Sequence, residues 1–86
     1  MKIDNALRTK VLLACEACFP HPLTNVSFQK LEETLGKDAL AGTIIYLHES
    51  GLIETKFNYN SQYRDFSFKH VRITAKGLDS VFHTAS

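Results

Sequence analysis

The 86-residue sequence has no tryptophan, one methionine, two cysteines, two prolines and four glycines. So little proline and glycine argues against disorder. No apolar run approaches the roughly 18 residues of a membrane span, and the start, Met1-Lys2-Ile3-Asp4, is unlike a secretory signal. Two cysteines without an export signal favour free thiols in a reducing compartment. We therefore expect a cytoplasmic, non-membrane protein with one domain over residues 1–86.

An excess of charge of one sign is also missing, since ten lysines and arginines face nine acids. The distribution is less even. Residues 55–77 contain five bases and one acid, whereas residues 1–54 contain five bases and seven acids. A basic segment on a nearly neutral body indicates a local contact with an anionic partner. With 44% apolar and 22% charged residues, a chain of this length is expected to be a small binding module and not an enzyme.

Three helices are expected in the first half. The first is capped by Asp4 or Asn5 and ends near Phe19, because Pro20 and Pro22 disfavour helix before them. Its expected buried face contains Leu7, Val11, Ala14, Cys15 and Cys18.

A short extended piece over 23–26 is expected next, then a second helix capped by Ser27 and ended by Gly36. Asp38 is expected to cap a third helix, which ends at Gly51. Two helices joined by so short a link match a helix-turn-helix. The expected inward residues are Phe28, Leu31 and Leu35, then Leu40, Ile44 and Leu47.

The periodicity then changes to that of strands. Residues 53–59 alternate, with Phe57 and Tyr59 on the expected inner side, and residues 60–65 form a polar turn. A second strand covers 66–73, and its apolar alternation slips by one residue near His70, which predicts a β-bulge. Thr74 is expected to cap a last helix of about two turns. The apolar residues of that helix are Leu78, Val81 and Phe82.

Two segments resemble winged helix-turn-helix proteins. One is 39–54, in which Leu47 near the helix end is followed by a short polar stretch, Gly51-Leu52-Ile53 and a charged strand residue. The other is 72–79, with the phrase Ile73-Thr74-x-x-Gly77 that closes the wing in that superfamily. The resemblance covers about residues 5–83 and extends to small bacterial proteins, some of them phage-associated. It implies an α+β winged-helix fold and, as for most of the superfamily, binding to double-stranded DNA.

The expected hairpin concentrates the residues that suit a phosphate backbone. They are Lys56, Tyr63, Arg64, Lys69 and Arg72. Lysine and arginine neutralise phosphates, and tyrosine donates to phosphate or stacks on bases. The same residues would also suit an ordinary solvated hairpin with aromatic cross-strand pairs.

The third helix is less suited to DNA. Its expected outward face carries Asp38, Gly42, Ile45 and Glu49, with Tyr46 on the flank, and no Lys, Arg, Asn or Gln. Two carboxylates there would meet the negative field of DNA. This face, through Ile45 and Tyr46, could instead contact a protein.

The cysteines and histidines are the candidates for metal, redox or phosphate chemistry. Cys15 and Cys18 form a C-x-x-C with His21 nearby, but at the wrong end of a helix for a thiolate and without a second ligand pair. A buried packing role is expected for both thiols, with a zinc or redox role as the alternative. No metal or cofactor is expected. His48 is expected to pack beside the third helix, and His70 to meet phosphate when protonated.

The hypothesis from sequence is therefore a winged-helix DNA-binding protein, serving as a transcriptional regulator or a mobile-element accessory. The alternative is a winged helix that binds a protein through its third helix and does not bind DNA. The short final helix and the few residues before the first predict a monomer or a weak homodimer.

Overall fold

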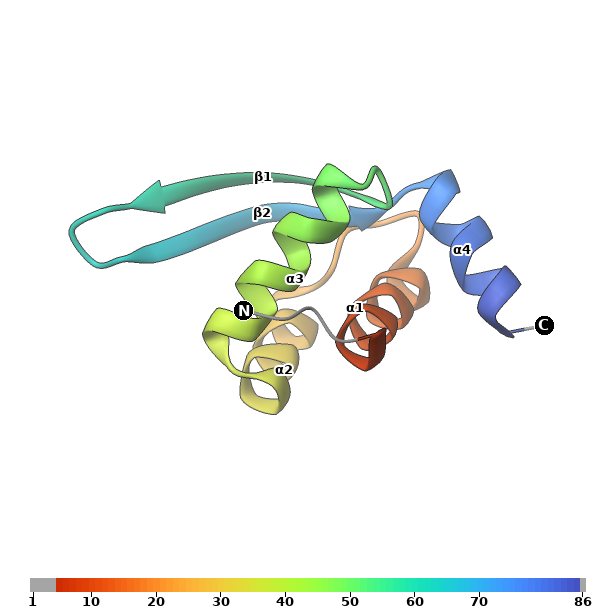
Figure 1. Cartoon of the computed structure of the whole chain (residues 1–86), viewed down its shortest axis with the longest axis horizontal. Coiled ribbons are helices and arrows are strands. Elements are labelled where there is room, and N and C mark those ends of the chain that lie inside the picture. Colours follow the sequence, from red (N-terminus) through yellow and green to blue (C-terminus); the bar gives the residue numbers. More distant parts are fainter. Residues whose placement is uncertain (1–4, 86) are drawn as a thin grey trace.

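The computed structural model describes residues 5–85, with side chains as far as Val81. Three helices come first: α1 (Asn5–Cys18), α2 (Asn25–Leu35) and α3 (Lys37–Glu49). They are followed by β1 (Ile53–Asn60), β2 (Asp65–Ile73) and α4 (Ala75–Ala85). The expected α+β class is confirmed, with four helices and a two-stranded antiparallel sheet, an order compatible with a winged helix (Figure 1). Helix α4 has 11 residues, about three turns where two were expected.

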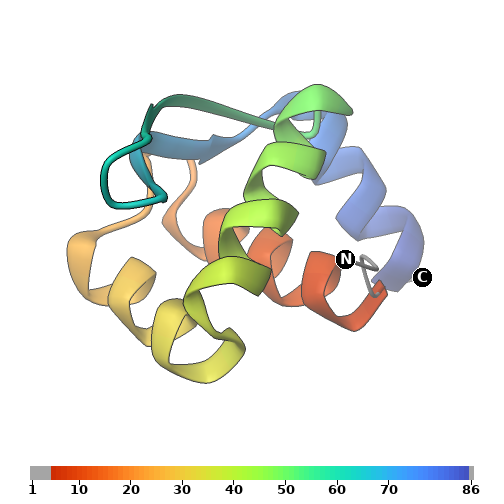
Figure 2. The ribbon, with the colours of Figure 1, turned by 60° about the vertical axis from the view of Figure 1, so that its left-hand side comes forward.

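The helices lie to one side of the hairpin (Figure 1, Figure 2), and the tip of the hairpin projects beyond them (Figure 1). The core lies where α1, α3 and α4 meet the base of the hairpin. Its buried residues are Val11, Leu12, Cys15, Leu40, Ile44, Leu47, Ile53, Val71, Ile73 and Val81. None of the helices within residues 5–85 is long and apolar enough to cross a membrane.

The buried stripe of α1 is narrower than the sequence suggested. Val11 and Cys15 are buried as expected, and Leu12 joins them. Leu7, Ala14 and Cys18 were expected in the core but are only half-buried. The stripe is centred on the side of α1 that packs on α3, β2 and α4, so residues at its edges keep contact with solvent. The predicted Asp4 cap and the apolar role of Phe82 fall outside the side chains that the structure describes.

Helix α2 begins earlier than expected. The prediction of Ser27 as its cap is wrong, because Thr24 is the cap and its Oγ1 accepts a hydrogen bond from the Ser27 N–H at 3.1 Å. Of the expected extended piece, Asn25 and Val26 belong to α2, while Thr24 keeps an extended conformation. Just before Thr24, the Leu23 N–H donates to the Val71 carbonyl at 2.8 Å, which ties the entry of α2 to strand β2.

Gly36 is the whole link between α2 and α3. Its φ of +90° is costly for any residue with a side chain, which explains glycine here. Its N–H donates to the Glu32 carbonyl at 2.9 Å, and its carbonyl accepts from the Leu40 N–H at 3.0 Å. The predicted Asp38 cap is wrong: α3 begins at Lys37, and in the described chain no side chain caps it. Asp38 lies in the first turn, where the helix dipole favours a carboxylate.

The predicted bulge is confirmed. In the register, Glu54 pairs with Arg72 but Lys56 pairs with Lys69, so Thr55 faces two residues of β2, His70 and Val71. His70 has a φ of +57°. The extra residue returns Val71 to the inner face, which resolves the slip in the alternation.

The Thr-x-x-Gly phrase has a structural explanation. Thr74 Oγ1 donates to the Gly51 carbonyl at 2.7 Å and accepts from the Gly77 N–H at 3.1 Å, so it caps α4 as expected. A Cβ on Gly77 would overlap the Leu52 carbonyl oxygen and lie 2.6 Å from Ile73 Cγ1. The contacts of Thr74 and Gly77 therefore fix the base of the hairpin against α4 and the end of α3.

Candidate nucleic-acid interface

The hairpin has two chemically different faces. Cross-strand partners share a face, and Phe57 opposite Phe68 turns toward the helices. The Phe68 ring centroid is 6.2 Å from that of Phe28 in α2, and the Phe57 centroid is 5.7 Å from that of His48 in α3. The adjacent pair Lys56 and Lys69 therefore lies on the opposite face, away from the helices.

Lys56 and Lys69 are direct cross-strand partners, and both are exposed. Like charges placed directly opposite each other destabilise a sheet. The next pair on that face, Asn58 and Ser67, carries no charge. Within residues 5–81, neither lysine has an ion-pair partner. This face is therefore a site of uncompensated positive charge.

Arg72 behaves differently from the other predicted phosphate contacts. It is half-buried, and its guanidinium donates to Glu54 Oε2 at 2.9 Å across the strands. Its charge is thus compensated by its cross-strand partner. The prediction of Arg72 as a free phosphate contact is not supported by this geometry.

The tip of the hairpin is a tight polar turn. Asn60 Oδ1 accepts hydrogen bonds from the backbone N–H groups of Gln62 at 3.0 Å and Tyr63 at 3.3 Å. Arg64 closes the turn with a φ of +51°, a conformation that only a few per cent of non-glycine residues adopt. Both predicted tip contacts are accessible, with Tyr63 72% exposed and Arg64 exposed.

Phe57 and Tyr59 lie on the helix-facing side, as expected, but they are not buried. They are 37% and 54% exposed. The cause is the length of the hairpin, whose outer half projects past the helices that would otherwise cover it (Figure 1).

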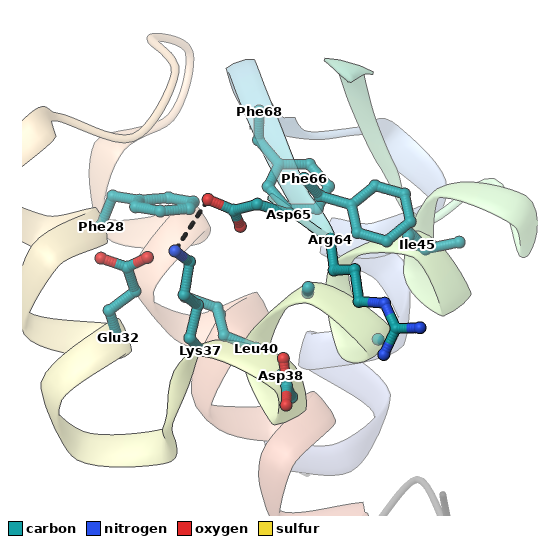
Figure 3. A pocket seen from close by; sticks show the side chains of 12 residues that line it. Phe28, Glu32, Lys37, Asp38, Leu40, Ile45, Arg64, Asp65, Phe66 and Phe68 are labelled. Atoms are coloured by element: carbon teal, nitrogen blue, oxygen red, sulfur yellow. Dashed lines mark ion pairs between the residues drawn. The ribbon is translucent and has the colours of Figure 1, made fainter. Parts of the chain in front are cut away.

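A groove of about 230 Å³ separates α3 from the outer half of the hairpin (Figure 3). It brings together Asp38, Gly42, Ile45 and Arg64 from the predicted site and leaves out Tyr46 and Glu49. Gly42 and Ile45 are half-buried in it and do not form the open outward face that was expected. Its apolar lining consists of Phe28, Leu40, Ala41, Gly42, Ile45, Phe66 and Phe68.

An ion pair that the sequence did not suggest joins the two walls of this groove. Lys37 Nζ, at the start of α3, lies 2.7 Å from Asp65 Oδ2 at the start of β2 (Figure 3). The hydrogen bond to Asp65 and the negative charge of its carboxylate raise the pKa of Lys37 above its usual 10.5. Asp65, the single acid of residues 55–77, is therefore neutralised within the protein.

Tyr46 lies on the α1 side of α3. The Arg8 guanidinium is 5.6 Å from the centroid of its ring, and Arg8 Nη2 donates to Asn5 Oδ1 at 2.8 Å. Tyr46 remains 42% exposed. Glu49, also exposed, is the last residue of α3.

The two cysteines are free and differ in environment. Burial in the core raises the pKa of Cys15 to about 12, with a smaller contribution from Cys18. A thiol held in its neutral form is a poor nucleophile and a poor metal ligand. The side chains that the structure describes contain no group of three or more His, Cys, Asp or Glu arranged to hold a metal.

The histidines divide between packing and exposure. His48 is half-buried with its ring edge-on to Phe57, at 85° between the ring planes, in line with the packing role expected. His70 is exposed at the bulge, next to Lys69.

No protein-family model, curated protein or solved structure matches this chain. The inference about function therefore rests on the two faces and the tip of the hairpin.

Proposed function

We propose that this chain is a winged-helix domain that binds double-stranded DNA through its hairpin, as a small transcriptional regulator or mobile-element accessory protein. The observation that carries the proposal is the exposed cross-strand pair of Lys56 and Lys69. A pair of like charges destabilises the free protein. A bound phosphate backbone would relieve this repulsion, and that relief would add to the affinity for DNA.

The charge balance of the whole hairpin supports this proposal. It contains two acids, and both are paired: Glu54 with Arg72 and Asp65 with Lys37. Three cations, Lys56, Arg64 and Lys69, have no ion-pair partner among the described side chains. Duplex DNA presents about one negative charge per 1.7 Å of its axis, so these cations have the complementary charge.

Helix α3 has a secondary role in this proposal. Its accessible carboxylates, Asp38 and Glu49, repel phosphate and offer no donor to base edges. We infer that α3 lies near the duplex, with Tyr46 donating to phosphate, and that the hairpin supplies most of the affinity. Binding of this kind is strongly salt-dependent and weakly selective for sequence.

The alternative, capture of a protein partner by α3, has less support. Ile45, its expected apolar anchor, is half-buried in the groove under the hairpin. Tyr46 is partly covered by Arg8. The apolar surface that α3 offers to a partner is therefore small.

The test is a fluorescence-anisotropy titration of a labelled duplex of mixed sequence at salt concentrations from about 50 to about 200 mM. Wild-type protein should bind more weakly as salt rises. Lys56→Gln and Lys69→Gln should each lower the salt slope by about one unit. Lys30→Gln is the matched control, because Lys30 is an exposed lysine on α2, away from the hairpin.

A second variant guards against masking by the acids of α3. Asp38→Asn combined with Glu49→Gln should tighten duplex binding, since repulsion is removed. Absence of salt-sensitive binding by both the wild type and this variant at about 50 mM salt would overturn the proposal.

A further inference from the structure

We propose that the aromatic face of the hairpin, formed by Phe57, Tyr59 and Phe66 with Tyr63 at the tip, binds the unpaired bases of single-stranded nucleic acid. This inference rests on the proposed function, because Arg64, one of the three hairpin cations without an ion-pair partner among the described side chains, would hold the phosphates here as well. It adds a second surface on the other side of the hairpin from Lys56 and Lys69.

The rings on this face form a continuous array. Tyr59 and Phe66 are cross-strand partners with centroids 4.8 Å apart, and Phe66 stacks on Phe68 at 6.1 Å and 19°. Phe57 is within 6.1 Å of Phe66 and 5.8 Å of Phe68. Four rings from two strands therefore present one aromatic surface.

The array is fixed at its inner end and open at its outer end. Phe68 is half-buried and packs on Phe28 of α2. Exposure then rises toward the tip, from 37% at Phe57 to 54% at Tyr59 and 72% at Tyr63. Phe57 and Tyr59 are held by neighbouring rings and therefore lose little conformational freedom when a ligand stacks on them.

Stabilisation of the hairpin accounts for only part of this array. A two-stranded hairpin is marginal by itself, and aromatic cross-strand pairs support it. That explains Phe66 and Phe68, which contact other rings and are half-buried. It does not explain Tyr63, whose ring has no aromatic partner among the described residues and which is the most exposed large hydrophobic residue.

The aromatic side also has its own cation. Arg64 lines the groove together with Phe66 (Figure 3), is exposed, and has no ion-pair partner in the described chain. Proteins that bind single strands combine such cations with aromatic rings on which successive bases stack. The bases of a duplex are already stacked on one another. Only unpaired bases are therefore free to stack on these rings.

The experiment compares a labelled single strand of about 12 nucleotides with a duplex of mixed sequence. Tyr59→Ala combined with Tyr63→Ala should weaken single-strand binding about tenfold or more, from stacking values per base. It should reduce duplex affinity far less, because of the two tyrosines Tyr63 alone is a predicted duplex contact. Tyr59→Phe combined with Tyr63→Phe is the matched control and should retain single-strand binding. Both tyrosines are exposed, so thermal unfolding should show that the variants fold normally.

The outcomes separate this inference from the proposed function. Single-strand affinity that is unchanged in the double alanine variant, or reduced equally for the duplex, overturns the aromatic platform. Duplex binding that still depends on Lys56 and Lys69 would leave the proposed function standing in that case. Failure of the wild type to bind either nucleic acid would overturn both.

Discussion

Replacing Lys69 by glutamine should stabilise the free protein while weakening the proposed binding to DNA. Glutamine keeps most of the length of lysine but removes one charge of the Lys56–Lys69 pair. Like charges directly opposite each other on a sheet are destabilising, here by about 0.5 kcal/mol from the usual range for cross-strand pairs. For a domain of this size that corresponds to an increase in melting temperature of about 2 to 4 °C. Few surface substitutions are expected to change stability and binding in opposite directions.

Circular dichroism at low salt would measure the melting temperature, and Lys30→Gln would serve as the control. The gain of the Lys69→Gln variant should disappear at about 1 M salt, where exposed charges are screened beyond roughly 3 Å. A lower melting temperature for Lys69→Gln, or a gain that is independent of salt, would refute the reasoning that repulsion is stored in this pair.

Four further predictions concern other parts of the molecule. Gly77→Ala should lower the stability by about 2 kcal/mol or more, because its Cβ would overlap the Leu52 carbonyl oxygen; a wild-type urea midpoint would contradict this. Iodoacetamide at neutral pH should modify the half-buried Cys18 and spare the buried Cys15, as read by mass spectrometry. The raised pKa of Cys15 should also make stability, complete below pH 9.0, fall progressively as the pH rises to about 12, and Cys15→Ala should remove that loss. Lys37, whose pKa is also raised, stabilises the fold below pH 10.5 and loses this contribution above it, so Lys37→Met should flatten the alkaline part of the pH profile.

The secondary structure could be predicted because its signals are local. The slip in alternation near His70 is visible in eight residues of sequence, and it became the observed bulge. Gly36 and Gly51 mark helix ends because both need a positive φ. Thr74 could be predicted as a helix cap because a threonine directly before an apolar helix is a local signal for a cap.

The errors arise where a distant contact decides between local options. Thr24 and Ser27 are both good caps by type, and the hydrogen bond from Leu23 to Val71 of β2 accompanies the choice of Thr24. The half-burial of Gly42 and Ile45 depends on the hairpin that lies over α3. Helical periodicity cannot reveal that cover.

The candidate site, like the helix cap, could be predicted from the sequence only in part. The sequence placed the basic residues on a hairpin, but their partners depend on the register of the strands. Arg72 meets Glu54, 18 residues away, and Asp65 meets Lys37 from another element. The exposure of Tyr59 likewise depends on how far the hairpin projects beyond the helices (Figure 1).

The claim that the cations of the hairpin bind DNA is tested most directly by an amide chemical-shift map of ¹⁵N-labelled protein titrated with duplex at low salt. The largest changes should occur at the amides of Lys56, Arg64 and Lys69, while the exposed Lys30 on α2 should change little. Changes confined to α1 or α2, or no salt-sensitive change in the hairpin, would contradict the claim.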